Sequence, residues 1–297
     1  MSEDFLRAAT EWLGDEELFR QALERTARDH GFAAALIEKD FFCSLVLAAL
    51  AAAAPDHLLF KGGTCLSKVY TGFYRLSEDL DFSIPVESSS SRAARRRLIE
   101  PIRAICAGIS ARLPQVSVLE PLRGANLSRQ YIQTLGYRSR LDGTTARIRV
   151  EIGLREPAMI APRPEPAGTL LVNPLTGRTA LPRFTVRVMD EEELWAEKVR
   201  AALGRREPAI RDFFDLDYAL RTGRLDLSDP DFIVLAGRKL AVTGTGPGEL
   251  TEQKLAAIER QIGTDLKPVL RARDFERFDL DRVWTELLAL SHRINRQ

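Results

Sequence analysis

Two aspartates separated by one residue, Asp79 and Asp81, lie in a stretch that alternates polar and apolar residues. This alternation predicts a β-strand, in which side chains at i and i+2 project from one face with Cα atoms about 7 Å apart. Paired carboxylates are the oxygen ligands that Mg²⁺ and Mn²⁺ prefer. The pair is therefore a candidate site for a divalent metal ion.

A glycine pair comes shortly before this strand. The apolar run Leu58–Phe60 leads into Lys61, Gly62, Gly63 and Thr64, and a helical pattern follows. A turn at a helix N-terminus presents unpaired backbone N–H groups and the positive end of the helix dipole, which suit phosphate groups. Each feature alone is unspecific, since 42 acidic residues make chance Asp-x-Asp pairs common. Together they predict nucleotide phosphate chemistry.

The order of these features resembles the signature of DNA polymerase β-like nucleotidyltransferases, in which a Gly-Gly or Gly-Ser pair precedes an Asp-x-Asp or Asp-x-Glu strand. The stretch KGGTCLSKVYTGFYRLSEDLDF is more closely similar to the first motif of the AbiEii family, the toxins of type IV toxin–antitoxin pairs, which include the MenT toxins. An upstream segment of that family resembles Glu38-Lys39-Asp40; a solvated charged turn is the alternative interpretation.

The resemblance implies an α/β (α+β) fold, with a polymerase β-like nucleotidyltransferase domain, a mixed or antiparallel sheet flanked by helices, and a C-terminal helical lobe. We place the boundary near residue 189, giving domains 1–189 and 190–297. The implied activity is Mg²⁺- or Mn²⁺-dependent transfer of a nucleoside monophosphate from an NTP to an RNA, expected to be a tRNA 3′ end, which blocks translation. The implied partner is an antitoxin protein encoded nearby.

The resemblance also assigns roles to individual residues. Asp79 and Asp81 would bind metal, and Glu151, on the return strand of a predicted hairpin, would be the third carboxylate. The alternative for Glu151 is a cross-strand ion pair with an arginine. The nucleotide phosphates would be held by Lys61, Gly62, Gly63, Thr64, Ser67 and Lys68.

A second group of charged residues lies in 190–220. Lys198 would contact the nucleotide, Asp212 would support the active site, and Asp215 is a further candidate of the same RD…D helix. A surface helix pair held by ion pairs is the alternative. Ser77, two residues before Asp79, is a hypothetical regulatory site, because a phosphate there would place about −2 charge beside the metal carboxylates.

Four arginines, Arg92, Arg95, Arg96 and Arg97, open a predicted helix after a polar break. They are either a basic patch for an RNA backbone or a solvated helix face. The net charge of the 297-residue chain is only +1, so any nucleic-acid surface must be a local patch. Three widely spaced cysteines and the absence of a signal-like N-terminus favour the cytoplasm, and the longest apolar run, Leu45–Ala54, is too short for a membrane span.

The remaining pattern predicts the elements that position these residues. We expect helices over 3–27, 33–54 and about 92–113, the last kinked or restarted at Pro101. A hairpin over 129–154 turns at Asp142-Gly143 in type I′ geometry. Prolines keep 156–182 irregular and disfavour a central strand there, and a strand follows at 184–188. Two helices separated by 204–208 fill 190–220, and helices near 229–240, 250–262 and 280–294 complete the lobe.

Two other functions remain open from the sequence. One is a kinase-like phosphotransferase on the same scaffold, and the other is a non-catalytic module that binds an NTP or a protein. The Asp79–Asp81 pair argues against the second, because a binding module has no need of paired metal ligands.

Overall fold

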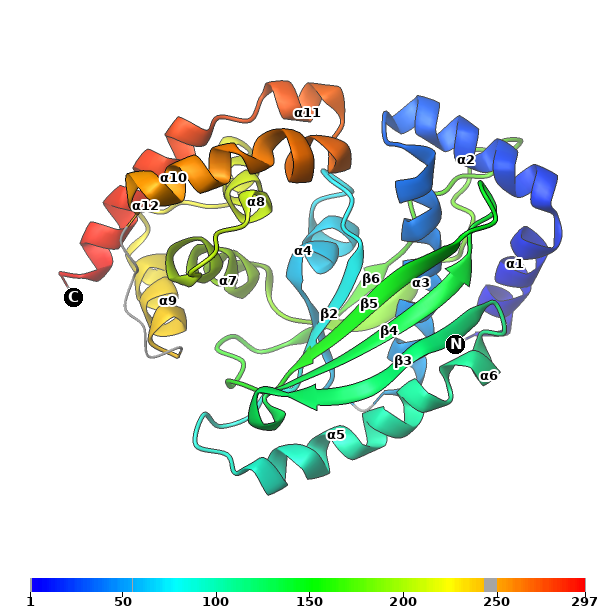
Figure 1. Ribbon diagram of the computed structural model, residues 1–297, viewed down its shortest axis with the longest axis horizontal. Coiled ribbons are helices and arrows are strands. Elements are labelled where there is room, and N and C mark those ends of the chain that lie inside the picture. The colour runs from blue at the N-terminus through cyan, green and yellow to red at the C-terminus, as the bar shows by residue number, and fades with distance from the viewer. Residues whose placement is uncertain (1, 55, 243–249, 297) are drawn as a thin grey trace. The chain divides into compact units, whose positions relative to one another are not determined.

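The computed structural model describes residues 2–54, 56–242 and 250–296 (Figure 1). The chain divides into two compact units, Met1–Met189 and Asp190–Gln297. Within the described ranges, no helix combines the length and apolar character that a bilayer crossing needs.

The first unit contains a seven-stranded sheet in the order β3-β4-β5-β2-β1-β7-β6. The pairs β2–β5 and β1–β7 are parallel and the other neighbours are antiparallel, so the sheet is mixed and the expected fold class is confirmed. The strands are β1 Leu59–Lys61, β2 Asp79–Ser83, β3 Val116–Ala125, β4 Gln130–Arg138, β5 Thr145–Gly153, β6 Arg163–Ala167 and β7 Phe184–Val188.

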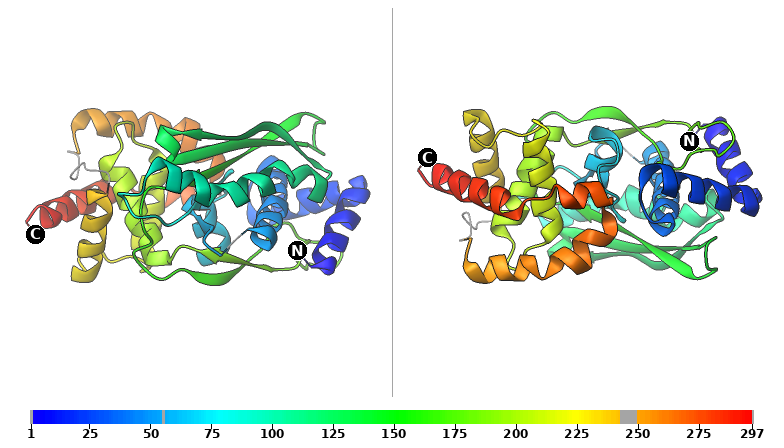
Figure 2. Two further views of the ribbon diagram at one scale, coloured as in Figure 1. Left: turned by 90° about the horizontal axis from the view of Figure 1, so that it is seen from below. Right: turned by 90° about the horizontal axis from the view of Figure 1, so that it is seen from above.

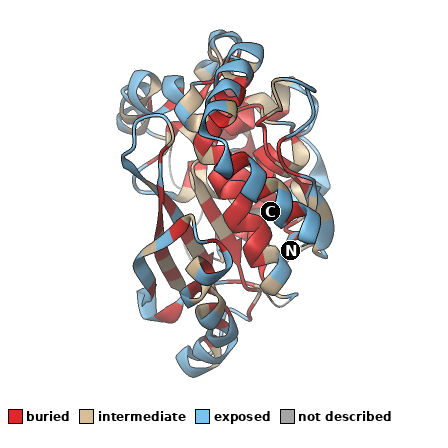
Figure 3. Cartoon of the chain, turned by 90° about the vertical axis from the view of Figure 1, so that its right-hand side faces the viewer, coloured by how far each residue is buried: buried red, intermediate tan, exposed pale blue. Residues whose placement is uncertain are grey.

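Helices cover one face of this sheet. Helix α3 (Ala34–Ala53) packs against β7, β2 and β5, while α5 (Arg92–Ala107) and α6 (Ile109–Arg112) pack along β3 (Figures 1 and 2). Strand residues alternate accordingly, and the change from buried to less buried positions is visible along the strands in Figure 3. Leu80 and Val150 are register partners on the buried face, so Asp79 and Asp81 project from the opposite face.

The Glu38-Lys39-Asp40 segment lies on α3 and ties it to three other parts of the unit. Glu38 accepts hydrogen bonds from Ser139 Oγ at 2.8 Å and from the Arg140 backbone N–H. Lys39 pairs with Glu78 at 2.9 Å. Asp40 Oδ2 accepts from the Leu170 N–H at 2.9 Å. Glu38 and Asp40 are buried, so the interpretation as a solvated charged turn is wrong.

Two predicted helices differ in their breaks. The segment 3–27 forms two helices, α1 (Glu3–Gly14) and α2 (Glu16–His30), because Asp15 caps α2 by accepting from the Leu18 N–H at 2.9 Å. Helix α5 continues through Pro101 and ends before Gly108. Proline has no N–H to donate to the carbonyl of Arg97, four residues earlier. Both residues are exposed, so water can solvate that carbonyl.

The sheet also departs from the predictions at its turns and edges. The 129–154 hairpin forms, but residues 139–144 make a longer loop than a type I′ turn, with Gly143 at φ +72°. Strand β3 was missed, since its register is interrupted by bulges that blur the alternation. Strand β6 was missed as well: Pro164 and Pro166 lie at the edge of the sheet, where missing N–H donors are tolerated.

The second unit is helical. Helix α7 packs against α8 and α9, and α12 packs against α7, α8 and α9. Ion pairs with buried carboxylates join these helices: Lys239 of α9 with Glu193 of α7 at 2.7 Å, both fully buried, and Arg282 of α12 with Asp217 of α8 at 2.9 Å. The helices are α7 Glu191–Gly204, α8 Ile210–Arg221, α9 Pro230–Ala241, α10 Glu252–Glu259, α11 Ala272–Glu276 and α12 Leu280–Ile294. Asp190 caps α7, as its sequence indicates.

Candidate functional site

Three of the predicted carboxylates lie on neighbouring strands. Asp81 on β2 is the register partner of Lys61 on β1 and of Glu151 on β5, and Asp79 is the partner of Arg149. Register partners share a face of the sheet, so Asp79, Asp81 and Glu151 all project from the face that α3 does not cover. The parallel pairing of β2 with β5 therefore supplies the adjacency that the role of Glu151 requires.

The glycine turn meets the same group of residues. The chain turns at Gly62, with φ of +78°, into a short α-helix, Gly62–Cys65, which continues as the π-helical turn Leu66–Tyr70. A Cβ at Gly62 would lie 2.5 Å from Asp81 Oδ2, closer than any side chain allows. Only glycine permits this approach, because it combines a left-handed backbone with the absence of a side chain.

The following residues fix the turn to the strand. Thr64 is buried, and its hydroxyl donates to the Asp79 carbonyl. A Cβ at Gly63 would lie 2.3 Å from Arg75 Nη2 and 3.4 Å from Ser77 Oγ. Arg75 is itself buried, so the predictions missed a guanidinium packed against the glycine pair. The position of Arg75 in the loop just before β2 was the sequence feature that could have indicated its place beside the glycine pair. Ser77 lies beside Gly63, as the regulatory hypothesis requires.

The structure does not bring Lys68 to the glycine turn. Its side chain is 1% exposed and is paired with the Asp40 carboxylate. It also donates to Ser44 Oγ at 2.7 Å. Ser67 is buried and donates to the Arg75 carbonyl at 2.5 Å. Both side chains lie on the π-helical turn Leu66–Tyr70 and make these contacts inside the unit, so a contact with phosphate would require them to leave their present partners.

Glu151 makes several contacts in the sheet. Its carboxylate accepts from Gln130 Nε2 and pairs with Arg149 at 2.9 Å and with Arg155 at 3.9 Å. The arginine pairing that was the alternative interpretation is therefore present, along the strand rather than across it. The described ranges contain no group of three or more His, Cys, Asp or Glu side chains placed to hold a metal ion. Asp79 and Asp81 carry the carboxylate oxygens that a hard cation prefers.

A buried thiol lies behind β2 on α3. Cys43 Sγ approaches the Glu78 carbonyl at 3.8 Å, and burial raises the pKa of Cys43 to about 12. The thiol therefore stays neutral at physiological pH and supplies no nucleophile to the site. The chemistry of this part of the sheet belongs to oxygen donors.

The charged residues predicted in the second unit form a compact cluster of their own. Lys198 Nζ lies 2.8 Å from Asp212 Oδ1 and 2.8 Å from Asp215 Oδ2. Arg205 contacts the other oxygen of Asp212 at 2.7 Å. Asp215 is fully buried and the Lys198 side chain is 13% exposed. The ion pairs of the alternative interpretation are therefore present, but they lie largely inside the unit and not on its surface.

Comparison with known proteins supports the fold. A crystal structure of JHP933 from Helicobacter pylori is similar with a TM-score of 0.50 and 15% identity, over 89% of this chain and 94% of that one. A second H. pylori structure, named "putative nucleotidyltransferase", gives a TM-score of 0.48 and 15% identity, over 95% and 96% of the two chains. No curated protein matches the chain.

The family comparison is more specific. The family model described as nucleotidyl transferase AbiEii toxin, type IV toxin–antitoxin system, matches residues 45–289. The match includes the glycine turn, the Asp79–Asp81 strand, Glu151 and the Lys198–Asp212–Asp215 cluster, and it covers most of the chain. The chain therefore belongs to the AbiEii family of nucleotidyltransferase toxins of type IV toxin–antitoxin systems.

Proposed function

We propose that this protein transfers a nucleoside monophosphate from an NTP to the 3′ end of an RNA, with tRNA as the expected acceptor, and thereby blocks translation. The observation that carries the proposal is the close approach of Gly62 to Asp81 on the strand that also holds Asp79. A phosphate-binding turn and a pair of metal-binding carboxylates would serve one reaction only if they converge, and the approach of Gly62 to Asp81 supports this assignment.

The carboxylates of Asp79 and Asp81 would hold Mg²⁺ or Mn²⁺, with Glu151 as the proposed third ligand. A bound divalent ion in such a site lowers the pKa of the acceptor hydroxyl and offsets charge on the phosphates. Glu151 would exchange its Arg149 contact for this role, since its backbone position beside Asp81 already suits it. Arg149 would then be left beside the phosphates as a cation.

The glycine turn would bind the nucleotide through its backbone. The N–H groups at Gly62, Gly63 and Thr64 open the short helix, and an anionic phosphate accepts from such groups without any side chain intervening. Lys61, on the strand next to Asp81, would add a positive charge at the same place. In this proposal Thr64 positions the turn through its bond to the Asp79 carbonyl.

Lys198 remains the proposed nucleotide contact of the second unit. Its ammonium group would offset charge that develops toward pyrophosphate, while Asp212 and Asp215 hold it in position. Its 13% exposed side chain leaves limited access, so we expect the contact to be with a phosphate oxygen rather than with a base.

The proposed partner in the cell is an antitoxin encoded beside the toxin. Phosphorylation of Ser77 is one way to neutralise the enzyme, because the added charge would stand beside Gly63 and repel the nucleotide phosphates. Mass spectrometry of the toxin after co-expression with the antitoxin tests this. An unmodified Ser77 in a fully neutralised toxin removes the idea.

Labelled nucleotides test the reaction itself. The protein is incubated with total RNA and with NTP labelled at either the α- or the γ-phosphate. We expect α-label on RNA 3′ ends, identified by sequencing those ends, and no γ-label on protein. Transfer of γ-label to protein would instead identify a kinase-like phosphotransferase, and binding of NTP without turnover in Mg²⁺ or Mn²⁺ would identify a non-catalytic module.

A further inference from the structure

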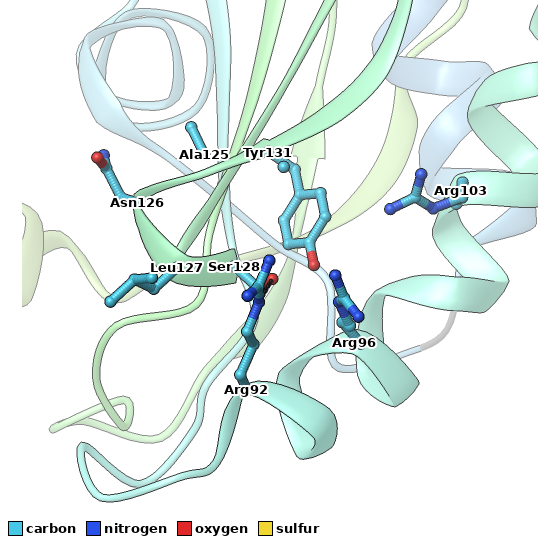
Figure 4. Close-up of a pocket in the computed structure, with 9 residues that line it drawn as sticks. Arg92, Arg96, Arg103, Ala125, Asn126, Leu127, Ser128 and Tyr131 are labelled. Atoms are coloured by element: carbon cyan, nitrogen blue, oxygen red, sulfur yellow. Dashed lines mark hydrogen bonds between the residues drawn. The ribbon is translucent and has the colours of Figure 1, made fainter.

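A small hollow with arginines along one wall lies beside α5 (Figure 4). It has a volume of about 230 Å³, and its other wall is the loop between β3 and β4. The described residues that line it include three arginines, Arg92, Arg96 and Arg103, and no carboxylate. We call this site the arginine hollow.

The three arginines form one stripe of the helix. Positions 92, 96 and 103 lie within about 40° of one another around an α-helix, so like charges gather on a single face. Arg92 is in the first turn, at the positive end of the helix dipole where acidic residues are usual, and Arg96 follows it in the second turn. This charge placement is unfavourable for the helix alone and becomes favourable when an anion occupies the hollow.

The guanidinium groups are only partly occupied by protein acceptors. Arg103 contacts the exposed Glu100 at 3.6 Å and the Leu122 carbonyl at 3.4 Å, and its cation lies 5.6 Å from the Tyr131 ring centre. Arg92 contacts Ser128 Oγ at 3.4 Å. Arg96 is exposed, and Figure 4 shows the Tyr131 hydroxyl directed toward it. Forked donors of this kind match phosphate oxygens.

The opposite wall is held in an unusual backbone conformation. Asn126, Leu127 and Ser128 have φ of 49°, 55° and 64°, a left-handed turn without glycine. Arg95 fastens this turn to α5, since its side chain is buried and contacts the Leu127 carbonyl at 3.4 Å. The wall is therefore fixed relative to the arginine stripe, although the Leu127 side chain is 70% exposed at the rim.

A hydrogen-bond chain connects this loop to the proposed metal site. Asn126 Nδ2 donates to Gln130 Oε1 at 2.6 Å, and Gln130 Nε2 donates to the Glu151 carboxylate. Tyr131, next along β4, faces α5 instead. The loop thus lines the arginine hollow and is linked to Glu151 through Gln130, and a polymer that follows it would reach both.

A comparable hollow in the second unit lacks this character. Its arginines Arg221 and Arg282 are both paired with the buried Asp217, and Arg293 donates to the Leu227 carbonyl at 3.1 Å. Asp217 neutralises two of these three cations, and the carboxylates of Asp226 and Glu286 also line the hollow, so it has little capacity for an external anion. Positive charge open to a ligand is a property of the arginine hollow.

We infer that the arginine hollow binds a backbone phosphate of the RNA acceptor, an inference that rests on the proposed function. The hollow is smaller than the roughly 300 Å³ of the smallest usual small-molecule sites, which suits one phosphodiester group better than an NTP. It lies across the sheet from the nucleotide site, so it takes the acceptor rather than the donor. It supplies position without sequence preference, as phosphate contacts do.

Equilibrium RNA binding without NTP tests the inference. The probe is a fluorescein-labelled RNA hairpin with a single-stranded 3′ overhang, and anisotropy is measured over a series of salt concentrations. Arg96→Gln removes one forked donor from the hollow. Arg97→Gln is the matched control, because Arg97 is also exposed on the same helix but does not line the hollow.

We expect Arg96→Gln to weaken binding roughly 10-fold, as for loss of a hydrogen bond to a charged group. The slope of log K against log salt should fall by about one. Arg97→Gln should leave both quantities near wild type, and Arg96→Lys should restore the slope but only part of the affinity. Arg92→Gln repeats the test should Arg96→Gln fail to fold.

Equal effects of Arg96→Gln and Arg97→Gln, or no binding of the hairpin by the wild type, would overturn the inference. The inference would also be overturned if Arg96→Gln weakened the binding of a labelled poly-glutamate peptide but not the binding of RNA. That result would assign the hollow to an acidic protein segment. Failure of the proposed function is distinguishable, because binding is measured without chemistry. If the protein transfers no α-phosphate, RNA binding that depends on Arg96 can still be observed. If the protein does transfer α-phosphate, RNA binding that is unaffected by Arg96→Gln would overturn this inference alone.

Discussion

At the scale of single residues, the buried pair of Lys68 and Asp40 shows how a side chain near a catalytic motif can serve the fold instead. The Lys68 side chain is 1% exposed and the pair lies between α3 and the turn after Gly63. Removing one member of a buried ion pair strands the other charge, at a cost of about 3–5 kcal/mol.

Lys68→Met should therefore lower the free energy of unfolding by about 3 kcal/mol and leave the KM for NTP unchanged in protein that remains folded. Urea unfolding and steady-state kinetics measure the two quantities. Lys39→Met is the matched control, because its partly exposed pair with Glu78 is worth about 1 kcal/mol or less. A Lys68→Met protein of normal stability with a raised KM would return Lys68 to the phosphate site.

Glu38 gives a prediction about pH. Burial raises the pKa of Glu38 above its ordinary value of 4.5, even though Arg140 and Ser139 donate to the carboxylate. The folded state therefore favours the protonated form. This contribution to stability is fully present below pH 4.5 and is lost as pH rises through the raised pKa.

Glu38→Gln removes that ionisation and keeps an acceptor for the Arg140 N–H. Urea unfolding of both proteins across this pH range should show the variant gaining stability relative to wild type as pH rises. A difference that is constant with pH, or one that grows toward acid, would contradict the assignment.

At the scale of elements, the glycine turn lies against β2, and Gly62 is the residue that allows this close approach. Gly62→Ala would place a methyl group 2.5 Å from Asp81 Oδ2 and displace that carboxylate. Gly72→Ala is a close control, because Gly72 also has a positive φ, +62°, but has open space around its Cβ position.

Gly72→Ala should lose about 1–2 kcal/mol of stability, the usual cost of a left-handed alanine, and Gly62→Ala should lose that amount plus the cost of displacing Asp81. Only Gly62→Ala should lose transfer activity, which a labelled-NTP assay measures alongside thermal unfolding. Equal transfer by the two variants would show that the approach of the turn to Asp81 has no catalytic consequence.

The same elements show what the sequence could predict. The period-two alternation placed Asp79 and Asp81 on one face of β2, because that pattern is a local property of a strand. The partnership of Asp81 with Glu151 depends on a parallel pairing between strands far apart in the chain, which no local pattern encodes. The direction of Lys68 was equally hidden, since the sequence does not specify which side of a short helix packs inward.

At the scale of the whole chain, the two compact units define separate cores. Phe213 is fully buried in the second unit, where it stacks with Trp284 at 6.1 Å between ring centres. Phe213→Ala should destabilise that unit by about 3–5 kcal/mol. Hydrogen exchange should then show lost protection in α7, α8 and α12 while β2 and β5 keep theirs. Equal loss in both would mean that the chain unfolds as one cooperative body.

The net charge of +1 gives no indication of an RNA-binding surface, because a local group of arginines is balanced by acidic residues elsewhere in the chain. The arginine stripe of α5 was visible in the sequence, but its meaning depended on where Asn126–Ser128 and Tyr131 lie. Arg95 illustrates the difference, because it belongs to the same run and yet points inward to hold the loop. Long-range packing, rather than residue type, separates the arginines that face a ligand from those that support the fold.

The most direct test of the account is the rate of α-label transfer from NTP to RNA by Asp81→Asn, with Asp56→Asn as the control at an exposed aspartate. The change keeps the size of the side chain and removes one charged metal ligand. We predict that Asp81→Asn lowers the transfer rate roughly 1,000-fold, because several kcal/mol of charge stabilisation are lost and about 1.4 kcal/mol corresponds to a factor of ten. Thermal unfolding should be unchanged. Transfer by Asp81→Asn at the rate of Asp56→Asn would contradict the account.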